Sequence, residues 1–151
     1  MQNISPLDET TYPWKLILIV DDDEDFGTDL VQVIHSETPY HAIYARDAFE
    51  ALRITRHLQC DLLLLDYLLP GIDGIDLYDL LHSQPSMAST PTILMSASTR
   101  LPQRAIEQRT IPRLNKPFEL DDLFDALRQF LGEPTPQQMS QPPAREGPAF
   151  P

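Results

Sequence analysis

The sequence predicts an α/β fold: a doubly wound, five-stranded parallel sheet with helices on both faces. Between residues 14 and 132, short apolar runs typical of buried strands alternate with segments whose apolar residues recur at helical spacing. Such repeated strand–helix units build a parallel sheet with covered faces. The run DLLLLD at 61–66 is apolar on both faces of any strand, which indicates a central strand. The flavodoxin-like strand order 2-1-3-4-5 suits a unit of this length.

The first half of the predicted sheet pairs each strand with a helix. KLILIV at 15–20 is the first strand, and apolar residues at helical spacing follow from Phe26. HAIYA at 41–45 is the second strand. The helix after it has one apolar face, formed by Ala48, Ala51, Leu52 and Thr55. DLLLLD then provides the third strand.

The second half contains one weak helix and ends in a strong one. Gly71 and Gly74 mark a turn. The helix after this turn has an apolar face formed by Ile75, Leu77, Leu80 and Leu81. PTILMSA at 91–97 is the fourth strand, and residues 100–108 form a helix with few apolar anchors. TIPRLN at 110–115 is the fifth strand, which we expect at a sheet edge because Pro112 has no N–H donor. A strong closing helix is indicated by apolar residues at helical spacing, namely Leu120, Leu123, Phe124, Leu127 and Leu131.

We expect a single domain at residues 14–132. A chain of 151 residues is long enough for one ordinary core and too short for two. Residues 133–151 are rich in proline and glutamine, which predicts a disordered tail or linker. Residues 1–13 have a milder form of this composition and are predicted to be a flexible N-terminal segment.

Charge and cysteine content exclude several classes of function. The net charge is −12 and no Lys/Arg cluster can neutralise phosphates, so nucleic acid is not expected as a direct partner. The single cysteine, Cys60, cannot form an internal disulfide. No membrane span or signal peptide is visible, so no membrane association is expected and a cytoplasmic location is predicted.

Polar residues follow the predicted strands where each strand ends. Asp21 and Asp22 follow the first strand, Asp66 ends the third, Ser96 lies at the end of the fourth, and Lys116 follows the fifth. The carboxyl ends of parallel strands share one edge of the sheet, where ligands bind at the switch point. The sequence therefore predicts that these five side chains converge on one crevice.

The chemistry of these residues suits phosphoryl transfer. Mg²⁺ prefers oxygen ligands and is typically held by one or two carboxylates, waters and a phosphate, so Asp21, Asp22 and Asp66 are candidate ligands. An aspartate carboxylate can act as a nucleophile toward phosphorus. The Lys116 ammonium and the Ser96 hydroxyl can stabilise the anionic transition state.

Four runs resemble the signature segments of the receiver domain of two-component response regulators. They are, in order, ILIVDDDEDF, LLLLDYLLPGIDG, PTILMSAS and NKPFELDDL. This resemblance covers residues 15–132. It implies that Asp66 is the phosphoacceptor, that Asp21 and Asp22 are metal acids, and that Ser96 and Lys116 contact the phosphoryl group.

The resemblance also assigns the rest of the acidic run and one peptide bond. Asp23, Glu24 and Asp25 are expected at the start of the first helix, where solvent and the helix dipole suffice to stabilise them. A cis peptide bond is implied before Pro117, the proline that follows Lys116.

Three features depart from the usual receiver pattern. Ser96 stands where threonine is commoner. Arg113 stands where the family generally has a Tyr or Phe whose inward rotation couples phosphorylation to output, and an arginine is costly to bury there without a partner. Arg109 and Thr110 replace the usual Gly-Ala pair, and the fourth helix is expected to be abbreviated.

The function that follows from the resemblance is a phosphoacceptor receiver of a two-component or phosphorelay system. It is not an enzyme in this reading, although it can assist its own dephosphorylation. A histidine kinase or histidine phosphotransfer protein would donate the phosphoryl group, and a downstream protein would receive the signal. Formation of a homodimer stays open.

Other functions compete with this one. Arg113 favours a receiver-fold interaction module that phosphorylation does not switch. A phosphatase resembling the haloacid dehalogenase group would use Asp21 as nucleophile and leave Asp66 without a role. An EF-hand is excluded because Phe26 occupies the position that requires glycine. The four histidines are interpreted as surface or boundary residues, because none has a second ligand at suitable spacing; they are His35, His41, His57 and His82.

Overall fold

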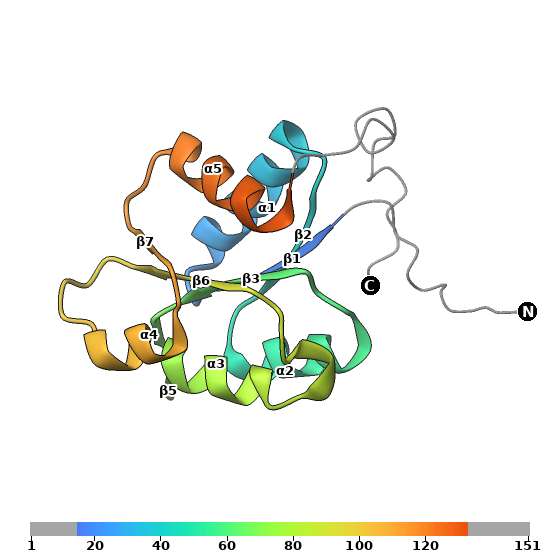
Figure 1. The fold of residues 1–151 in the computed structure, drawn as a ribbon. Coiled ribbons are helices and arrows are strands. Elements are labelled where there is room, and N and C mark those ends of the chain that lie inside the picture. The colour runs from blue at the N-terminus through green and yellow to red at the C-terminus, as the bar shows by residue number, and fades with distance from the viewer. Residues whose placement is uncertain (1–14, 133–151) are drawn as a thin grey trace, which may run out of the picture.

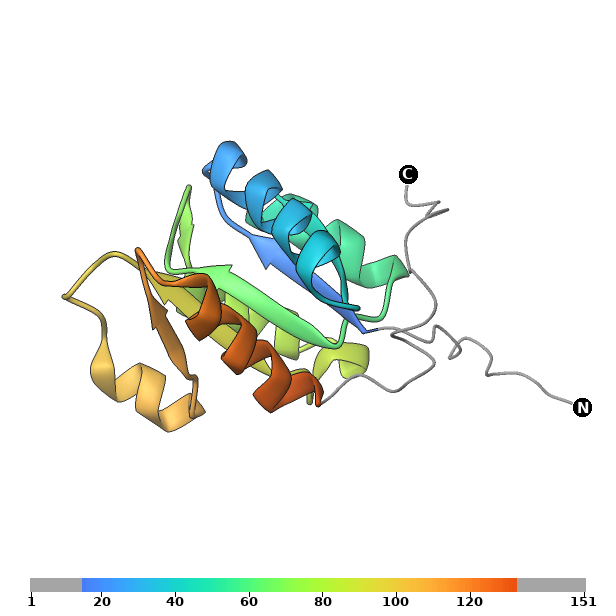
Figure 2. The same cartoon turned by 90° about the horizontal axis from the view of Figure 1, so that it is seen from above.

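The architecture is a five-stranded parallel sheet between two layers of helices. The structure is a computed structural model that describes residues 15–132, so the predicted flanking segments at 1–13 and 133–151 lie outside the described residues. The strand order is β2-β1-β3-β6-β7. This order is the predicted 2-1-3-4-5 once a small hairpin, β4–β5, is set aside. α1 and α5 cover one face of the sheet, and α2, α3 and α4 cover the other (Figures 1 and 2).

The elements follow the predicted alternation of strands and helices. The sheet strands are β1 (Leu16–Val20), β2 (His41–Ala45), β3 (Leu62–Asp66), β6 (Thr92–Ser96) and β7 (Arg113–Asn115). The helices are α1 (Glu24–Glu37), α2 (Ala48–His57), α3 (Gly74–His82), α4 (Gln103–Arg109) and α5 (Leu120–Leu131). A hairpin of β4 (Leu68–Leu69) and β5 (Ile72–Asp73) precedes α3, and a 3₁₀ turn (Pro85–Met87) follows it.

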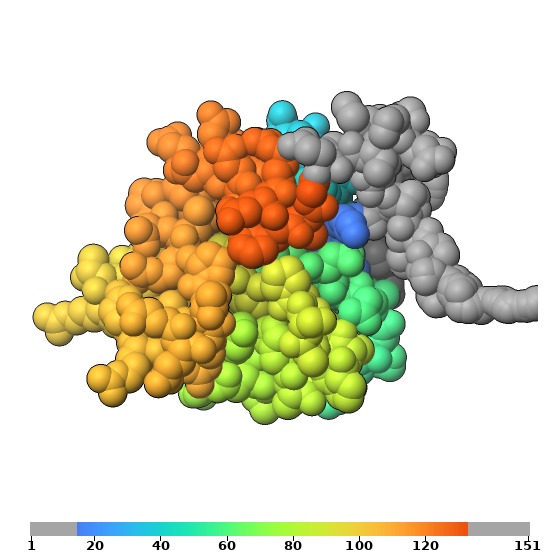
Figure 3. All heavy atoms as spheres, viewed as in Figure 1, coloured from blue at the N-terminus to red at the C-terminus, as the bar shows by residue number. Residues whose placement is uncertain are grey.

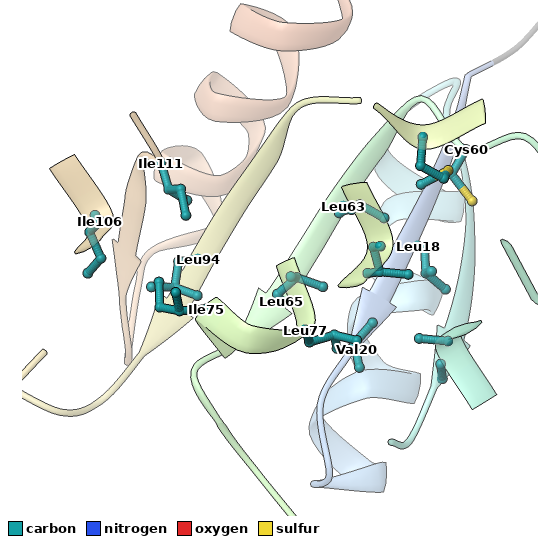
Figure 4. Packing of buried hydrophobic residues seen from close by; sticks show 14 of the residues in the cluster. Leu18, Val20, Cys60, Leu63, Leu65, Ile75, Leu77, Leu94, Ile106 and Ile111 are labelled. Atoms are coloured by element: carbon teal, nitrogen blue, oxygen red, sulfur yellow. The ribbon is translucent and has the colours of Figure 1, made fainter. Parts of the chain in front are cut away.

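Two apolar clusters, one on each face of the sheet, form the core. Every residue of β1, β3 and β6 is buried, as expected for central parallel strands. Alternate side chains of β1 point to opposite faces: Leu18 and Val20 pack in the cluster that includes α3 and α4 (Figure 4), and Ile17 packs in the other, with α1 and α5. The register aligns Val20 with Leu65, and Asp66 with Met95, so the strand ends share one edge.

Several predicted boundaries and burials are wrong in detail. The fifth strand is β7, three residues long, and Pro112 lies just before it rather than within it. Thr110 ends α4 in the left-handed conformation (φ 55°), so residues 110–112 turn the chain from helix into strand. The Pro112 carbonyl still accepts a hydrogen bond from the Leu94 N–H at 2.9 Å, and β7 is an edge strand as predicted. Two leucines predicted on apolar helix faces, Leu80 and Leu120, are 46% and 44% exposed, whereas Leu77 and Leu81 are buried as predicted.

The interpretation of the histidines is wrong for His41. This side chain is only 4% exposed at the start of β2. The ring of His35, from α1, lies against it with ring centroids 4.7 Å apart. His35 Nε2 accepts a hydrogen bond from the Ala42 N–H at 3.0 Å, so this ring also satisfies an outward-facing N–H of the edge strand β2.

Because of the His35–His41 pair, we expect the folded protein to be less stable in mild acid. Burial lowers the pKa of both His35 and His41, so the unfolded chain takes up protons below about pH 6.5 that the folded chain does not. Protonation of His35 also breaks its hydrogen bond to Ala42, worth about 0.5–1.5 kcal/mol. We expect the unfolding free energy of the wild type, relative to that of His35→Gln, to decrease from pH 7 to pH 5 in denaturant titrations. A difference that is constant over this range would contradict the assignment.

Within residues 15–132, no helix has the length and apolar content needed to cross a bilayer.

Candidate functional site

The five predicted site residues lie together at the carboxyl edge of the sheet. Asp21 directly follows β1, Asp66 and Ser96 are the last residues of β3 and β6, and Lys116 follows β7. The carboxylates of Asp21, Asp22 and Asp66 offer oxygen atoms that all lie within 4.8 Å of one another. The topology brings them together, because the ends of parallel strands meet at this edge.

Asp21 is the most constrained of the acids. Its side chain is 1% exposed, and both carboxylate oxygens accept hydrogen bonds. Oδ1 accepts from the Asp23 N–H at 2.9 Å, and Oδ2 accepts from Lys116 Nζ at 2.7 Å. Its backbone N–H donates to the Ala45 carbonyl at 3.2 Å. Asp22, in contrast, is exposed, so the two acids differ in their freedom to take up a cation.

Lys116 links the two buried acids. Its ammonium lies 2.7 Å from Asp21 Oδ2 and 3.4 Å from Asp66 Oδ1. The same group lies 4.2 Å from the centroid of the Phe26 ring, a cation–π contact from α1. The Lys116 N–H donates to the Ser96 carbonyl at 2.8 Å, and the Lys116–Pro117 peptide bond is cis, as the resemblance implies.

The pKa of Asp66 is shifted by its surroundings in the site. Burial, and then the neighbouring Asp21 carboxylate, raise the pKa of Asp66 to about 6, although the Lys116 ammonium acts in the opposite direction. The single positive charge of the Lys116 ammonium therefore does not neutralise the negative charges of Asp21, Asp22 and Asp66. Carboxylate oxygens at this spacing suit Mg²⁺, which is usually held by one or two carboxylates together with waters and a phosphate.

Ser96 and the acidic run occupy the places expected of them. The Ser96 side chain is buried at the end of β6, and its Oγ accepts a hydrogen bond from the Ser98 N–H at 2.9 Å. Asp23 is the N-cap of α1 and accepts from the Phe26 N–H at 3.1 Å. Glu24 and Asp25 lie in the first turn, where the helix dipole favours negative charge.

Gly74 has a role that sequence reasoning missed, since it identified this residue only as part of a turn. An added Cβ would lie 2.7 Å from the Asp66 carbonyl oxygen and 2.9 Å from the Tyr67 Cα. The Gly74 N–H donates to the Tyr67 carbonyl at 2.7 Å. The first residue of α3 must therefore lack a side chain for the helix to start directly against the end of β3.

Gly74→Ala is accordingly expected to lower the unfolding free energy by about 1–3 kcal/mol, because backbone rather than a flexible side chain has to move. Chemical denaturation measures this change directly. Unchanged or increased stability would contradict the close approach, since alanine is otherwise the better helix former by about 1 kcal/mol.

The surface formed by α3, α4, β7 and α5 carries the departures noted in the sequence. Figure 3 displays the surface formed by α3, α4, β7 and α5. Arg113 is exposed on β7, so no buried aromatic ring stands at this position. α4 is only seven residues long, as expected, and Arg109 from its last turn binds Asp79 of α3 through two hydrogen bonds of 2.8 Å. This pair lowers the pKa of Asp79 and ties α4 to α3.

Known proteins of similar sequence include response regulators. Residues 17–128 match the family model described as response regulator receiver domain. Sporulation initiation phosphotransferase F of Bacillus subtilis is 32% identical over 76% of this chain and 92% of that protein. The DNA-binding response regulator MtrA of Mycobacterium tuberculosis is 32% identical over 74% of this chain. That match covers 48% of MtrA, so the chain spans about half the length of this relative.

Solved structures with the same fold are receiver domains. The signal receiver domain of an HD domain-containing protein from Pseudomonas fluorescens Pf-5 has a TM-score of 0.71 at 34% identity, over 85% of this chain and 99% of that one. The response regulator TrrA from Thermotoga maritima, in complex with Mg²⁺-BeF, has a TM-score of 0.69 at 25% identity, over 78% of this chain and 99% of that one. With the family match across residues 17–128, these similarities show that the chain belongs to the receiver domains of two-component response regulators.

Proposed function

We propose that this chain accepts a phosphoryl group on Asp66 from a phosphohistidine, with Mg²⁺ held by Asp21, Asp22 and Asp66. The observation that carries the proposal is the arrangement of Lys116 between Asp21 and Asp66, 2.7 Å from one carboxylate and 3.4 Å from the other. In this arrangement the Lys116 ammonium already lies beside the Asp66 carboxylate when that carboxylate reacts.

The transfer is a substitution at phosphorus. A carboxylate oxygen of Asp66 attacks, an acyl phosphate forms, and the bond from phosphorus to the donor's imidazole nitrogen breaks. The imidazole nitrogen keeps the electron pair of the broken bond. Mg²⁺, when bound, supplies positive charge to the phosphoryl oxygens and helps to orient them.

The residues around Asp66 can bind the phosphoryl oxygens during transfer. The Lys116 ammonium can break its longer contact, with Asp66 Oδ1, and bind a phosphoryl oxygen instead. Its shorter ion pair with Asp21 can remain in place. Ser96 Oγ lies on the neighbouring strand end and can donate to another phosphoryl oxygen. Asp21 has both oxygens engaged, which disfavours it as the nucleophile of a phosphatase of the haloacid dehalogenase type.

The proposal extends to partners and organisation. The Bacillus relative is named a phosphotransferase and the Thermotoga structure contains Mg²⁺-BeF, which supports phosphoryl transfer with Mg²⁺ in this chain. We propose a histidine kinase or phosphotransfer protein as donor, residues 14–132 as the receiver domain, and a cytoplasmic setting. The charge of −12 disfavours nucleic acid as a contact of this chain, although longer relatives are named as DNA-binding.

A second candidate, a receiver-fold interaction module that phosphorylation does not switch, is favoured by one observation. Arg113 is exposed on β7 where an aromatic side chain would be needed for inward rotation. The intact set of acids, hydroxyl and ammonium supports the first proposal over this one.

Transfer from a phosphohistidine protein tests the proposed function. A labelled histidine phosphotransfer protein should pass its phosphoryl group to the wild type in the presence of Mg²⁺. Asp66→Asn and the chelated wild type should receive none, while Asp29→Asn, at an exposed aspartate on α1, should be labelled normally. Labelling of Asp66→Asn at the wild-type rate would overturn the assignment.

A further inference from the structure

Tyr44 on β2 makes an unusual contact with the turn that carries the metal acids. Its hydroxyl donates a hydrogen bond of 2.6 Å to the backbone carbonyl of Asp21. This carbonyl belongs to the peptide unit that joins Asp21 to Asp22. The contact comes from a different strand, 23 positions away along the chain, so local sequence did not suggest it.

Gly27 on α1 makes room for the Tyr44 ring. A Cβ added to Gly27 would lie 2.2 Å from Tyr44 Cε1 and 2.4 Å from Cδ1, far inside contact distance. Gly27 is buried within a regular helix, where glycine costs about 0.5–1 kcal/mol relative to alanine. Close approach of the Tyr44 ring provides the physical reason for glycine at this position.

The hydrogen bond from Tyr44 adds to two other contacts that hold the turn at Asp21 and Asp22 in place. The Asp21 N–H is bound to Ala45, and its Oδ1 accepts from the Asp23 N–H. With the carbonyl bound as well, the peptide between Asp21 and Asp22 cannot rotate without breaking a contact. Asp22 is exposed, so this peptide is what aims its carboxylate at Asp21 and Asp66.

We infer that Tyr44 is a positioning residue that orients the metal acids Asp21 and Asp22. The absence of a side chain at Gly27 leaves room for the Tyr44 ring to reach them. This inference rests on the proposed function, because it concerns the same Mg²⁺ site. Groups that orient metal ligands from outside the coordination shell typically change metal affinity by about 10- to 100-fold when removed. Tyr44 does so here through the backbone.

The first test is the Mg²⁺ affinity of the unphosphorylated protein, measured by calorimetric titration. Tyr44→Phe removes the hydroxyl and keeps the ring, and we expect Mg²⁺ binding to weaken about tenfold. Tyr78→Phe, at a half-buried tyrosine of α3 outside the site, is the matched control and should bind as the wild type does. At saturating Mg²⁺, phosphorylation of Tyr44→Phe by an acyl phosphate should recover to the wild-type rate, which general damage to the fold would not permit.

The second test uses the coupling between the two residues. Gly27→Ala should weaken Mg²⁺ binding in the wild-type background, because the new methyl group displaces the Tyr44 ring. In a Tyr44→Ala background, the same substitution should leave Mg²⁺ affinity unchanged, since the ring is already absent. Equal effects of Gly27→Ala in both backgrounds would overturn the role of Gly27.

The outcomes separate this inference from the proposed function. If the wild type binds Mg²⁺ and Tyr44→Phe binds it equally well, the positioning role is overturned and the proposed function stands. If the wild type binds no Mg²⁺ at millimolar concentration, the proposed metal site itself is overturned.

Discussion

Asp66→Asn is expected to abolish phosphorylation and, without metal, to make the protein more stable at pH 7. The pKa of Asp66 is raised from 3.8 to about 6, so the ionised carboxylate at pH 7 is held in an unfavourable environment. Asparagine removes that charge and leaves a side chain of the same shape. After allowance for solvent screening, the expected gain is about 1–2 kcal/mol.

The size of this stability difference depends on pH and on bound metal. Because the folded state binds a proton more tightly than the unfolded state, the penalty from Asp66 is present above about pH 6 and disappears toward pH 4. The stability difference between Asp66→Asn and the wild type should therefore vanish at pH 4 in denaturant titrations. Saturating Mg²⁺ should stabilise the wild type more than the variant. Asp29→Asn controls for a change in surface charge, and a variant less stable than the wild type at pH 7 would contradict the account.

Lys116→Gln is expected to slow phosphorylation of Asp66 by about 100-fold, the usual cost of removing one group that stabilises developing negative charge. Two effects act in the same direction. The transferring phosphoryl group loses its ammonium partner, and the pKa of Asp66 rises further because Lys116 no longer lowers it. Rates with an acyl phosphate at saturating Mg²⁺ measure the change.

The same variant should bind Mg²⁺ more tightly, by about tenfold, because the ammonium and the cation compete for the same carboxylates. Slower chemistry together with tighter metal binding is a combination that misfolding cannot produce. Lys15→Gln is the matched control, since Lys15 is exposed beside the first strand and should have wild-type behaviour. Weaker Mg²⁺ binding by Lys116→Gln would contradict the proposed site.

The sheet and the convergence of the five predicted site residues at its edge could be anticipated, because both follow from periodicity along the chain. Continuous apolar runs identify buried parallel strands, and parallel strands bring their carboxyl ends together. Asp21, Asp66 and Lys116 therefore meet although they lie up to 95 positions apart. The exposed position of Arg113 follows from the cost of burying a guanidinium group, and the brevity of α4 is expected from departures from the receiver pattern.

The features that could not be predicted depend on contacts across the fold. The β4–β5 hairpin has strands of two residues, too short for any periodic pattern. His41 is buried because His35 from another element covers it. Likewise, no local signal links Gly27 to Tyr44, because a clash between a methyl group and a ring exists only once α1 lies on β2.

The central claim is that Asp66 accepts a phosphoryl group with the help of a divalent cation, and intact mass tests it most directly. After incubation with Mg²⁺ and an acyl phosphate, the wild type should gain the mass of one phosphoryl group, and chelation should prevent that gain. Asp66→Asn should gain nothing under the same conditions. An unmodified wild type, or an equal adduct on Asp66→Asn, would contradict the claim.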